Sequence, residues 1–130
     1  MRGAGGVPTL PALMVSDAQI VAHPARGEVF YRVVRAEQPR VEDFRSHREQ
    51  PRRRPVPAGT PWLLLVGVSM FDAREGALQI ARRRPAWVAE LRLPANRGIH
   101  VAVTGSHGHR TVWGDADVLA ACVRACHVAP

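Results

Sequence analysis

The sequence predicts a single small α+β domain with a mixed or mainly antiparallel sheet of about 4–6 strands and 2–3 helices. Residues 28–35 and 86–93 alternate between two sets of side chains with the two-residue period of a strand. Residues 62–84 begin with an apolar run and continue as an amphipathic stretch, the order expected for a strand followed by a helix. A chain of 130 residues suits one domain around one core.

Residues 1–26 predict a partly ordered N-terminal arm, because glycine and proline recur there without a sustained period. The first strand is expected over residues 28–35, with Arg32 on the same face as Phe30 and Val34. An arginine on a largely apolar face must extend to solvent, pair with a carboxylate or meet an anionic ligand. The strand pattern alone leaves these three roles for Arg32 open.

Residues 39–46 predict a loop or short helical turn, with Phe44 pointing inward and Asp43 and Ser46 as possible caps. Residues 47–59 predict an exposed loop, since neither a helix nor a central strand tolerates so many prolines. The three arginines at 52–54 lie in this loop, where they could contact phosphate groups or only face solvent.

The central segment predicts a buried strand at residues 63–68 and a helix that begins at Asp72. The Asp72 side chain can accept backbone N–H groups at the helix start, and Glu75 can reach back in a capping box. Arginines at 82–84 favour the C-terminal end of the helix, and Pro85 ends it.

Further strands are expected at residues 86–93 and 99–103. The glycine-rich segment 104–114 predicts a loop with room for a short strand at residues 110–113. Asp115 is placed to cap a closing helix, and the last residues can add an edge strand.

The net charge of +7 comes entirely from arginine, since the 18 basic residues include no lysine. The exclusive use of arginine has the character of a compositional bias, so the charge is weak evidence for nucleic-acid binding. A basic surface still attracts a nucleotide, nucleic acid or an acidic protein. No apolar run is long enough to span a bilayer and no signal peptide is evident, which predicts a cytoplasmic protein without membrane association. The two cysteines are expected to be free thiols.

No Walker loop, dinucleotide-binding glycine motif, serine nucleophile elbow or paired-cysteine zinc pattern occurs. His107 and His109 flank a glycine, but zinc requires three or four ligands, so no metal is expected. His109 could act as an acid, a base or a donor to phosphate, or it could be a surface histidine. Ser69 ends the predicted buried strand, where it could hold a ligand or satisfy a backbone group.

From Val29 onward the chain resembles a group of small uncharacterised actinobacterial proteins. They share an arginine-bearing first strand, a DF-x-S segment, a G-[IV]-S strand end and a GH-x-T-x-WGD loop. The matching residues are Arg32, then Asp43, Phe44 and Ser46, then Gly67, Val68 and Ser69, then Gly108, His109, Thr111, Trp113, Gly114 and Asp115. The order of elements is more remotely similar to the compact ADP-ribosyltransferase-like fold, which includes RES-type toxins and RNA 2′-phosphotransferases.

This resemblance implies an NAD-directed transferase or NAD-degrading enzyme, toxin-like in character, with NAD as substrate. It implies that Arg32 grips the dinucleotide, that Ser69 is the second catalytic residue, and that Glu90 or His109 is the third. A glutamate at the usual late position is not evident, and Asp115 suits a helix cap better. The further ligand contacts implied are Tyr31, Asp43, Ser46, Thr111 and Trp113, with Trp113 stacking on a flat ring.

The alternative function is a non-enzymatic basic module that binds nucleic acid or an acidic protein through the arginines at 52–54. The enzymatic hypothesis makes the sharper structural prediction. It requires Arg32, Ser69 and His109 to converge on one open cleft of nucleotide size.

Overall fold

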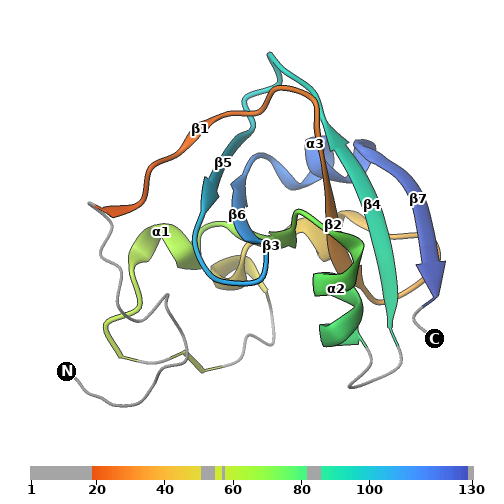
Figure 1. The fold of residues 1–130 in the computed structure, drawn as a ribbon, viewed down its shortest axis with the longest axis horizontal. Coiled ribbons are helices and arrows are strands. Elements are labelled where there is room, and N and C mark those ends of the chain that lie inside the picture. Colours follow the sequence, from red (N-terminus) through yellow and green to blue (C-terminus); the bar gives the residue numbers. More distant parts are fainter. Residues whose placement is uncertain (1–18, 51–54, 57, 82–85, 129–130) are drawn as a thin grey trace.

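The computed structural model describes residues 19–50, 55–56, 58–81 and 86–128, and within them one antiparallel sheet carries the fold (Figure 1). The order of strands across the sheet is β1-β5-β6-β3-β2-β4-β7. The strands are β1 (His23–Pro24), β2 (Glu28–Val34), β3 (Val68–Phe71), β4 (Trp87–Leu93), β5 (His100–Val103), β6 (His109–Trp113) and β7 (Val123–Val128). The predicted α+β class is therefore confirmed, with seven strands in the described residues instead of the expected 4–6.

Helices cover both faces of this sheet. They are α1 (Trp62–Leu65), α2 (Arg74–Ala81) and α3 (Ala116–Ala121), with the 3₁₀ turns η3 (Val41–Phe44) and η4 (His47–Glu49). Helix α2 packs against β2, β3 and β4 on one face, while α3 packs with η3 over the other (Figure 1). No helix in the described part of the chain is long and apolar enough to cross a membrane.

The predicted alternation of β2 and β4 is confirmed by the two apolar clusters on opposite faces of the sheet. Phe30 and Val34 join the larger cluster, which also contains the fully buried Leu119 of α3. Tyr31 and Val33 pack in the smaller cluster beneath α2. Since successive strand residues point to opposite faces, Arg32 lies on the face of the larger cluster, together with Phe30 and Val34.

The predicted strand at residues 63–68 is wrong in its first half, because Trp62–Leu65 form the helical turn α1 and β3 begins only at Val68. Two features favour this helical turn. Pro61 precedes it, at a position where the fixed φ angle and the missing N–H group of proline are tolerated, and the leucines that follow are good helix formers. The Trp113 Nε1–H group donates a hydrogen bond to the Leu63 carbonyl oxygen at 3.0 Å, which holds the turn against β6. As a consequence, Ser69 lies inside β3.

The predicted proline-rich loop and the predicted N-terminal arm both contain short regular elements. The proline-rich segment begins with η4, whose start is capped by the Ser46 N–H group bonding to Glu49 Oε1 at 2.9 Å. In the predicted N-terminal arm, β1 pairs with β5, and the Ala25 N–H group donates to the Ile99 carbonyl at 2.9 Å. Residues 1–18 of that arm and the arginines at 52–54 and 82–84 lie outside the described residues.

The C-terminal third follows the prediction closely. Strands β4 and β5 occupy the expected segments, β7 forms the edge strand, and α3 begins directly after Asp115, although no side-chain cap bond from Asp115 is present. The one consequential difference is that β6 starts at His109, a residue earlier than expected. Pairing with β3 therefore fixes His109 in a strand, opposite Phe71.

Candidate functional site

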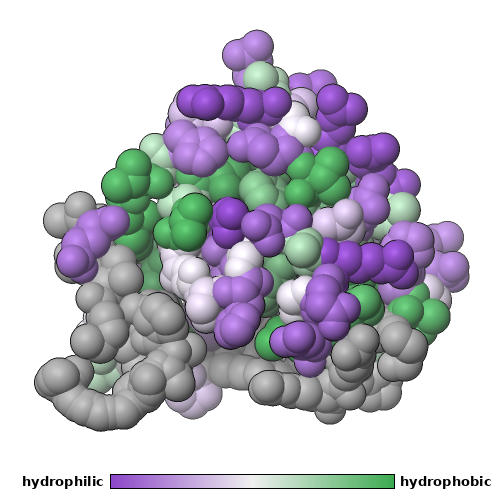
Figure 2. All heavy atoms as spheres, viewed as in Figure 1, coloured by the Kyte–Doolittle hydropathy of each residue, from purple (hydrophilic) through white to green (hydrophobic). Residues whose placement is uncertain are grey.

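Helix α2 covers only one half of its face of the sheet, and a cavity of about 580 Å³ occupies the other half, above β3 and β6. The described lining also includes residues of α1, α2, η4 and the loop 104–107. Most of the lining side chains are aliphatic groups, hydroxyls or imidazoles. Figure 2, which shows the molecule in the same view as Figure 1, has hydrophobic and hydrophilic residues interspersed on this side.

Ser69 and His109 meet on the cavity wall. Ser69 Oγ lies 2.9 Å from His109 Nε2, and His109 Nδ1 lies 3.0 Å from Thr104 Oγ1. Thr104 Oγ1 in turn lies 2.8 Å from Thr111 Oγ1, so four polar side chains form a continuous hydrogen-bonded chain. The sheet register explains the meeting. Strands β3 and β6 pair Ser69 with Thr111 and Phe71 with His109, which places the side chains of both pairs on one face of the sheet.

The surroundings of His109 keep its ring neutral. Burial lowers its pKa below the ordinary value of 6.5, and the neighbouring positive charge of Arg110 lowers the pKa further. Phe71 contacts the imidazole edge-on, with the ring centroids 5.4 Å apart. A neutral imidazole has one ring nitrogen that donates and one that accepts, so at neutral pH His109 can accept a proton from a group in the cavity.

The loop before β6 is fixed to the segment that leads into α2. Gly108 has a φ angle of 81°, and a Cβ atom there would lie 1.9 Å from Asp72 Oδ1. The Asp72 N–H group donates to the Gly108 carbonyl at 2.9 Å, and Arg110 Nη2 donates to Asp72 Oδ2 at 3.1 Å. The preceding residue, His107, also has a positive φ angle of 58° and lines the cavity. These contacts hold Gly108 and Arg110, the residues on either side of His109, against Asp72.

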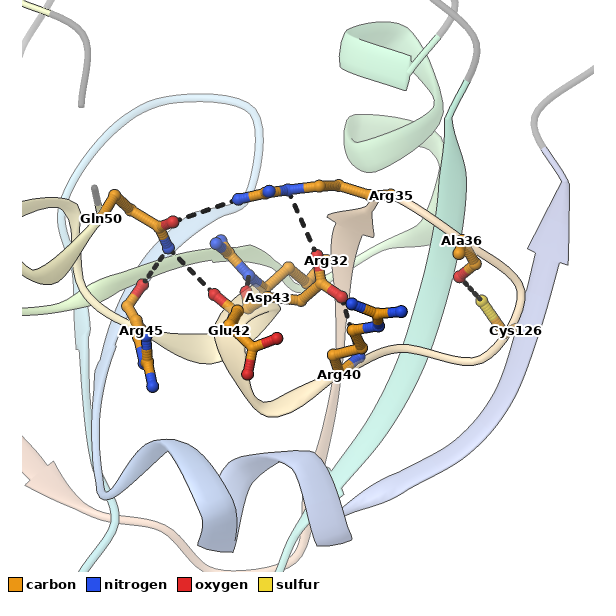
Figure 3. Close-up of polar contacts among 9 residues, drawn as sticks. All are labelled: Arg32, Arg35, Ala36, Arg40, Glu42, Asp43, Arg45, Gln50 and Cys126. Carbon is orange, nitrogen blue, oxygen red and sulfur yellow. Dashed lines mark hydrogen bonds and ion pairs between the residues drawn. The ribbon is translucent and has the colours of Figure 1, made fainter. Parts of the chain in front are cut away.

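Arg32 does not enter the cavity; its side chain lies on the opposite face of the sheet, toward η3 (Figure 3). Its Nε–H group donates to the Asp43 carbonyl oxygen and its Nη1 group to the Ser69 carbonyl oxygen, both at 2.7 Å. Burial lowers the pKa of Arg32 to about 10, with the Asp43 carboxylate opposing that shift, so the guanidinium remains charged at neutral pH. The structure thus joins Arg32 to Ser69 through the backbone of β3, while the hydroxyl of Ser69 faces the other way. The expected convergence of Arg32, Ser69 and His109 on one cleft is therefore wrong for Arg32, because residue alternation places it on the opposite face of the sheet, and only Ser69 and His109 meet at the cavity.

Asp43 and Ser46 are both buried and take part in capping, as the sequence predicts. Asp43 Oδ2 accepts the Arg40 N–H group at 2.9 Å, and Asp43 Oδ1 lies 3.7 Å from Arg35 Nε (Figure 3). Neither residue lines the cavity. Both residues lie on the η3 side, away from His109 and the cavity.

Glu90 and Tyr31 lie on the same face of the sheet as the cavity but on the half beneath α2, where they are cross-strand neighbours. Glu90 Oε2 lies 3.9 Å from Arg124 Nε, and neither Glu90 nor Tyr31 lines the cavity. Trp113 uses its indole N–H group to hold α1. Of the implied ligand contacts, the structure brings only Thr111 to the cavity wall.

Sequence reasoning missed Thr104, which orients His109, and Phe71, which packs against it. Neither belongs to a recognisable motif, and only the register between β5, β6 and β3 places them beside His109. Gln79 of α2 also lines the cavity. Nothing in the sequence singled it out, and in the structure it is exposed.

Cys122 and Cys126 are free thiols, as predicted. Burial raises the pKa of both thiols, so they are protonated and weak nucleophiles at neutral pH. Among the residues that the structure describes, no group of three or more histidine, cysteine, aspartate or glutamate side chains is arranged to hold a metal ion.

No protein-family model, curated protein or solved structure matches the chain, so these comparisons neither support nor oppose the resemblance to the ADP-ribosyltransferase-like fold.

Proposed function

We propose that the chain is an NAD-directed enzyme, either an ADP-ribosyltransferase-like protein or an NAD-degrading one, and that the nicotinamide-ribose end of NAD occupies the cavity. The observation that carries this proposal is the Ser69–His109 pair, 2.9 Å apart, on the wall of an open cavity of about 580 Å³. Small-molecule sites fall in the range of about 300–1,000 Å³ and combine apolar walls with a few convergent polar groups. The resemblance in sequence supplies NAD as the first ligand to test.

In this proposal the glycosidic bond between nicotinamide and ribose breaks as positive charge develops on the ribose. The neutral His109 takes the proton from the attacking water or acceptor hydroxyl, and Ser69 forms a hydrogen bond to the ribose. Phe71 and the aliphatic walls contact the flat ring. Glu90 has no part in the reaction, because it lies beneath α2 beside Arg124.

The diphosphate of NAD extends out of the cavity in this arrangement. No Arg, Lys, Asp or Glu side chain is among the described residues that line the cavity. Arg32 therefore contributes by holding the Ser69 carbonyl, which fixes the hydroxyl of the same residue for the ligand. This assigns Arg32 a positioning role in place of the direct grip on the dinucleotide that the resemblance implies.

A thermal-shift series with NAD, ADP-ribose and nicotinamide at millimolar concentration tests the proposal. Ligand present at 100 times its Kd stabilises the folded state by about 2.7 kcal/mol, which is readily measured as a rise in Tm. We expect NAD to raise the Tm of the wild type and of His100→Ala, an exposed histidine on β5, but not of Ser69→Ala or His109→Ala. Release of nicotinamide, followed by chromatography, should show the same dependence.

A wild-type Tm that none of the three ligands changes would end the proposal. So would an NAD-induced shift that survives in both cavity variants, since NAD would then bind elsewhere on the molecule.

A further inference from the structure

The hydrogen-bonded chain that runs from Ser69 to Thr111 has the arrangement of an activated nucleophile. A nucleophilic hydroxyl requires a base within hydrogen-bond distance, and the base requires a third group that orients it. Ser69 Oγ and His109 Nε2 meet the first requirement at 2.9 Å, and His109 Nδ1 and Thr104 Oγ1 meet the second at 3.0 Å. Ser69 is exposed, whereas Thr104 and Thr111 are buried, so the reactive end of the chain faces the cavity and the orienting end is shielded from water.

The direction of the hydrogen bonds decides whether Ser69 is activated. When Ser69 donates to Nε2, the proton on Nδ1 points to Thr104 and the hydroxyl of Thr104 points to Thr111. Every link of that chain has one donor and one acceptor at 2.8–3.0 Å. The arrangement needs a neutral imidazole, which the burial of His109 favours by lowering its pKa.

The sheet holds this geometry rigidly from both sides. Ser69 and Thr111 are paired residues of neighbouring strands, and His109 lies two residues before Thr111 in β6. From the opposite face, Arg32 binds the Ser69 carbonyl oxygen at 2.7 Å. Side chains that project from paired strands are placed more precisely than side chains on loops, as a nucleophile and its base require.

The cavity lining selects the class of substrate. The described side chains there carry aliphatic, aromatic, hydroxyl, amide and imidazole groups, with no carboxylate, ammonium or guanidinium among them. An anionic acyl group would meet no opposite charge from them, whereas an uncharged one can pack against Leu64, Leu65 and Ile80. The carboxamide of Gln79, from α2, adds a hydrogen-bond donor to the lining.

We propose that Ser69 is the nucleophile of an acyl-transfer activity on small uncharged esters, with His109 as its base and Thr104 and Thr111 orienting the ring. Ser69 Oγ bonds to the ester carbonyl carbon as its proton moves to His109 Nε2. The carbon–oxygen bond to the alcohol then breaks, and His109 returns the proton to the departing alcohol. Water repeats the two steps on the acylated serine, which gives a carboxylic acid and the free serine, so that ester and water are consumed without any redox partner.

A fluorophosphonate probe, which bonds covalently to activated serines, tests the proposal on the full chain without NAD. Intact-mass spectrometry should show one adduct on the wild type, and peptide mapping should place that adduct on Ser69. The adduct should be absent from Ser69→Ala. In His109→Gln it should form at least about 100-fold more slowly than in the wild type, as expected when a general base is lost. His100→Gln is the matched histidine control and should label at the wild-type rate.

Two further measurements separate this proposal from a structural role of the same residues. Thr104→Val keeps both Ser69 and His109 but removes the orienting hydroxyl, so it should slow labelling while the circular dichroism spectrum is unchanged. The wild type should hydrolyse p-nitrophenyl butyrate faster than the anionic p-nitrophenyl hemisuccinate.

An unlabelled wild type, an adduct on another residue, or equal labelling of His109→Gln and the wild type would overturn the assignment of Ser69. Faster hydrolysis of the hemisuccinate would overturn the inferred substrate class. Because the probe reaction needs no NAD, its failure is distinct from a failure of NAD to bind, and either proposal can stand without the other.

Discussion

Replacing Arg32 with methionine tests how strongly the guanidinium holds the strand that carries Ser69. The substitution keeps an unbranched side chain but removes two hydrogen bonds of 2.7 Å, which leaves the carbonyl oxygens of Asp43 and Ser69 without this donor. The bond to Asp43 is part-buried and the bond to Ser69 is exposed, so water replaces part of what is lost. At about 0.5–1.5 kcal/mol for each bond, the substitution predicts a loss of about 1–3 kcal/mol. That loss is a large fraction of the stability of a domain of this size.

Equilibrium unfolding in urea measures this loss, and Arg35→Met is the matched control. Arg35 leaves the same strand one residue beyond its end and lies 3.7 Å from the side chain of Asp43, but it is 72% exposed. An exposed ion pair contributes about 1 kcal/mol or less, so the control should change little. If Arg32→Met destabilises the fold no more than Arg35→Met does, the two carbonyl bonds do not brace β3 and the positioning role of Arg32 is refuted.

Two further predictions concern the loop and the histidine of the site. Gly108→Ala should lower the free energy of unfolding more than Gly98→Ala does, because both positions have a positive φ angle but only at Gly108 would the new Cβ meet a neighbour, the Asp72 carboxylate. Urea unfolding of both variants measures the difference. Equal losses would count against the contact between the loop and Asp72. Because the folded-state pKa of His109 lies below 6.5, the unfolded chain takes up this proton first, so the free energy of unfolding should fall as the pH decreases from about 6.5 through the folded-state pKa. His109→Gln should remove that part of the pH dependence, and an unchanged pH profile would show that His109 is not held neutral by the fold.

The alternation of residues was sufficient to predict the strands on which the sheet depends. In β4 the alternate residues Ala89, Leu91 and Leu93 are apolar and buried, and in β2 Phe30 and Val34 follow the same alternation on either side of Arg32. The pattern therefore assigns both strands and the side chains that share a face. The same reasoning placed Arg32 correctly beside Phe30 and Val34. It could not show which half of the opposite face would be left open for the cavity, because that depends on where α2 lies over β2, β3 and β4.

The leucine run shows why a continuous apolar segment is ambiguous. Leu63, Leu64 and Leu65 have no period that separates a strand from a helical turn, and the hydrogen bond from Trp113, which lies far along the chain, holds the turn that forms. The position of His109 was similarly undetermined, since a glycine-rich segment indicates a loop until its pairing with β3 is known. The meeting of Ser69 and His109 was expected from resemblance alone, and its physical cause is the sheet register.

The most direct test of the site is a measurement of where the proton of His109 resides. Long-range ¹H–¹⁵N correlation spectra of the folded wild type at pH 7 report the charge and the tautomer of each imidazole ring. We predict that His109 is neutral, with its proton on Nδ1 and with Nε2 accepting the Ser69 hydroxyl proton. A charged ring, or a neutral ring with the proton on Nε2, would contradict the assignment of His109 as the base that faces the cavity.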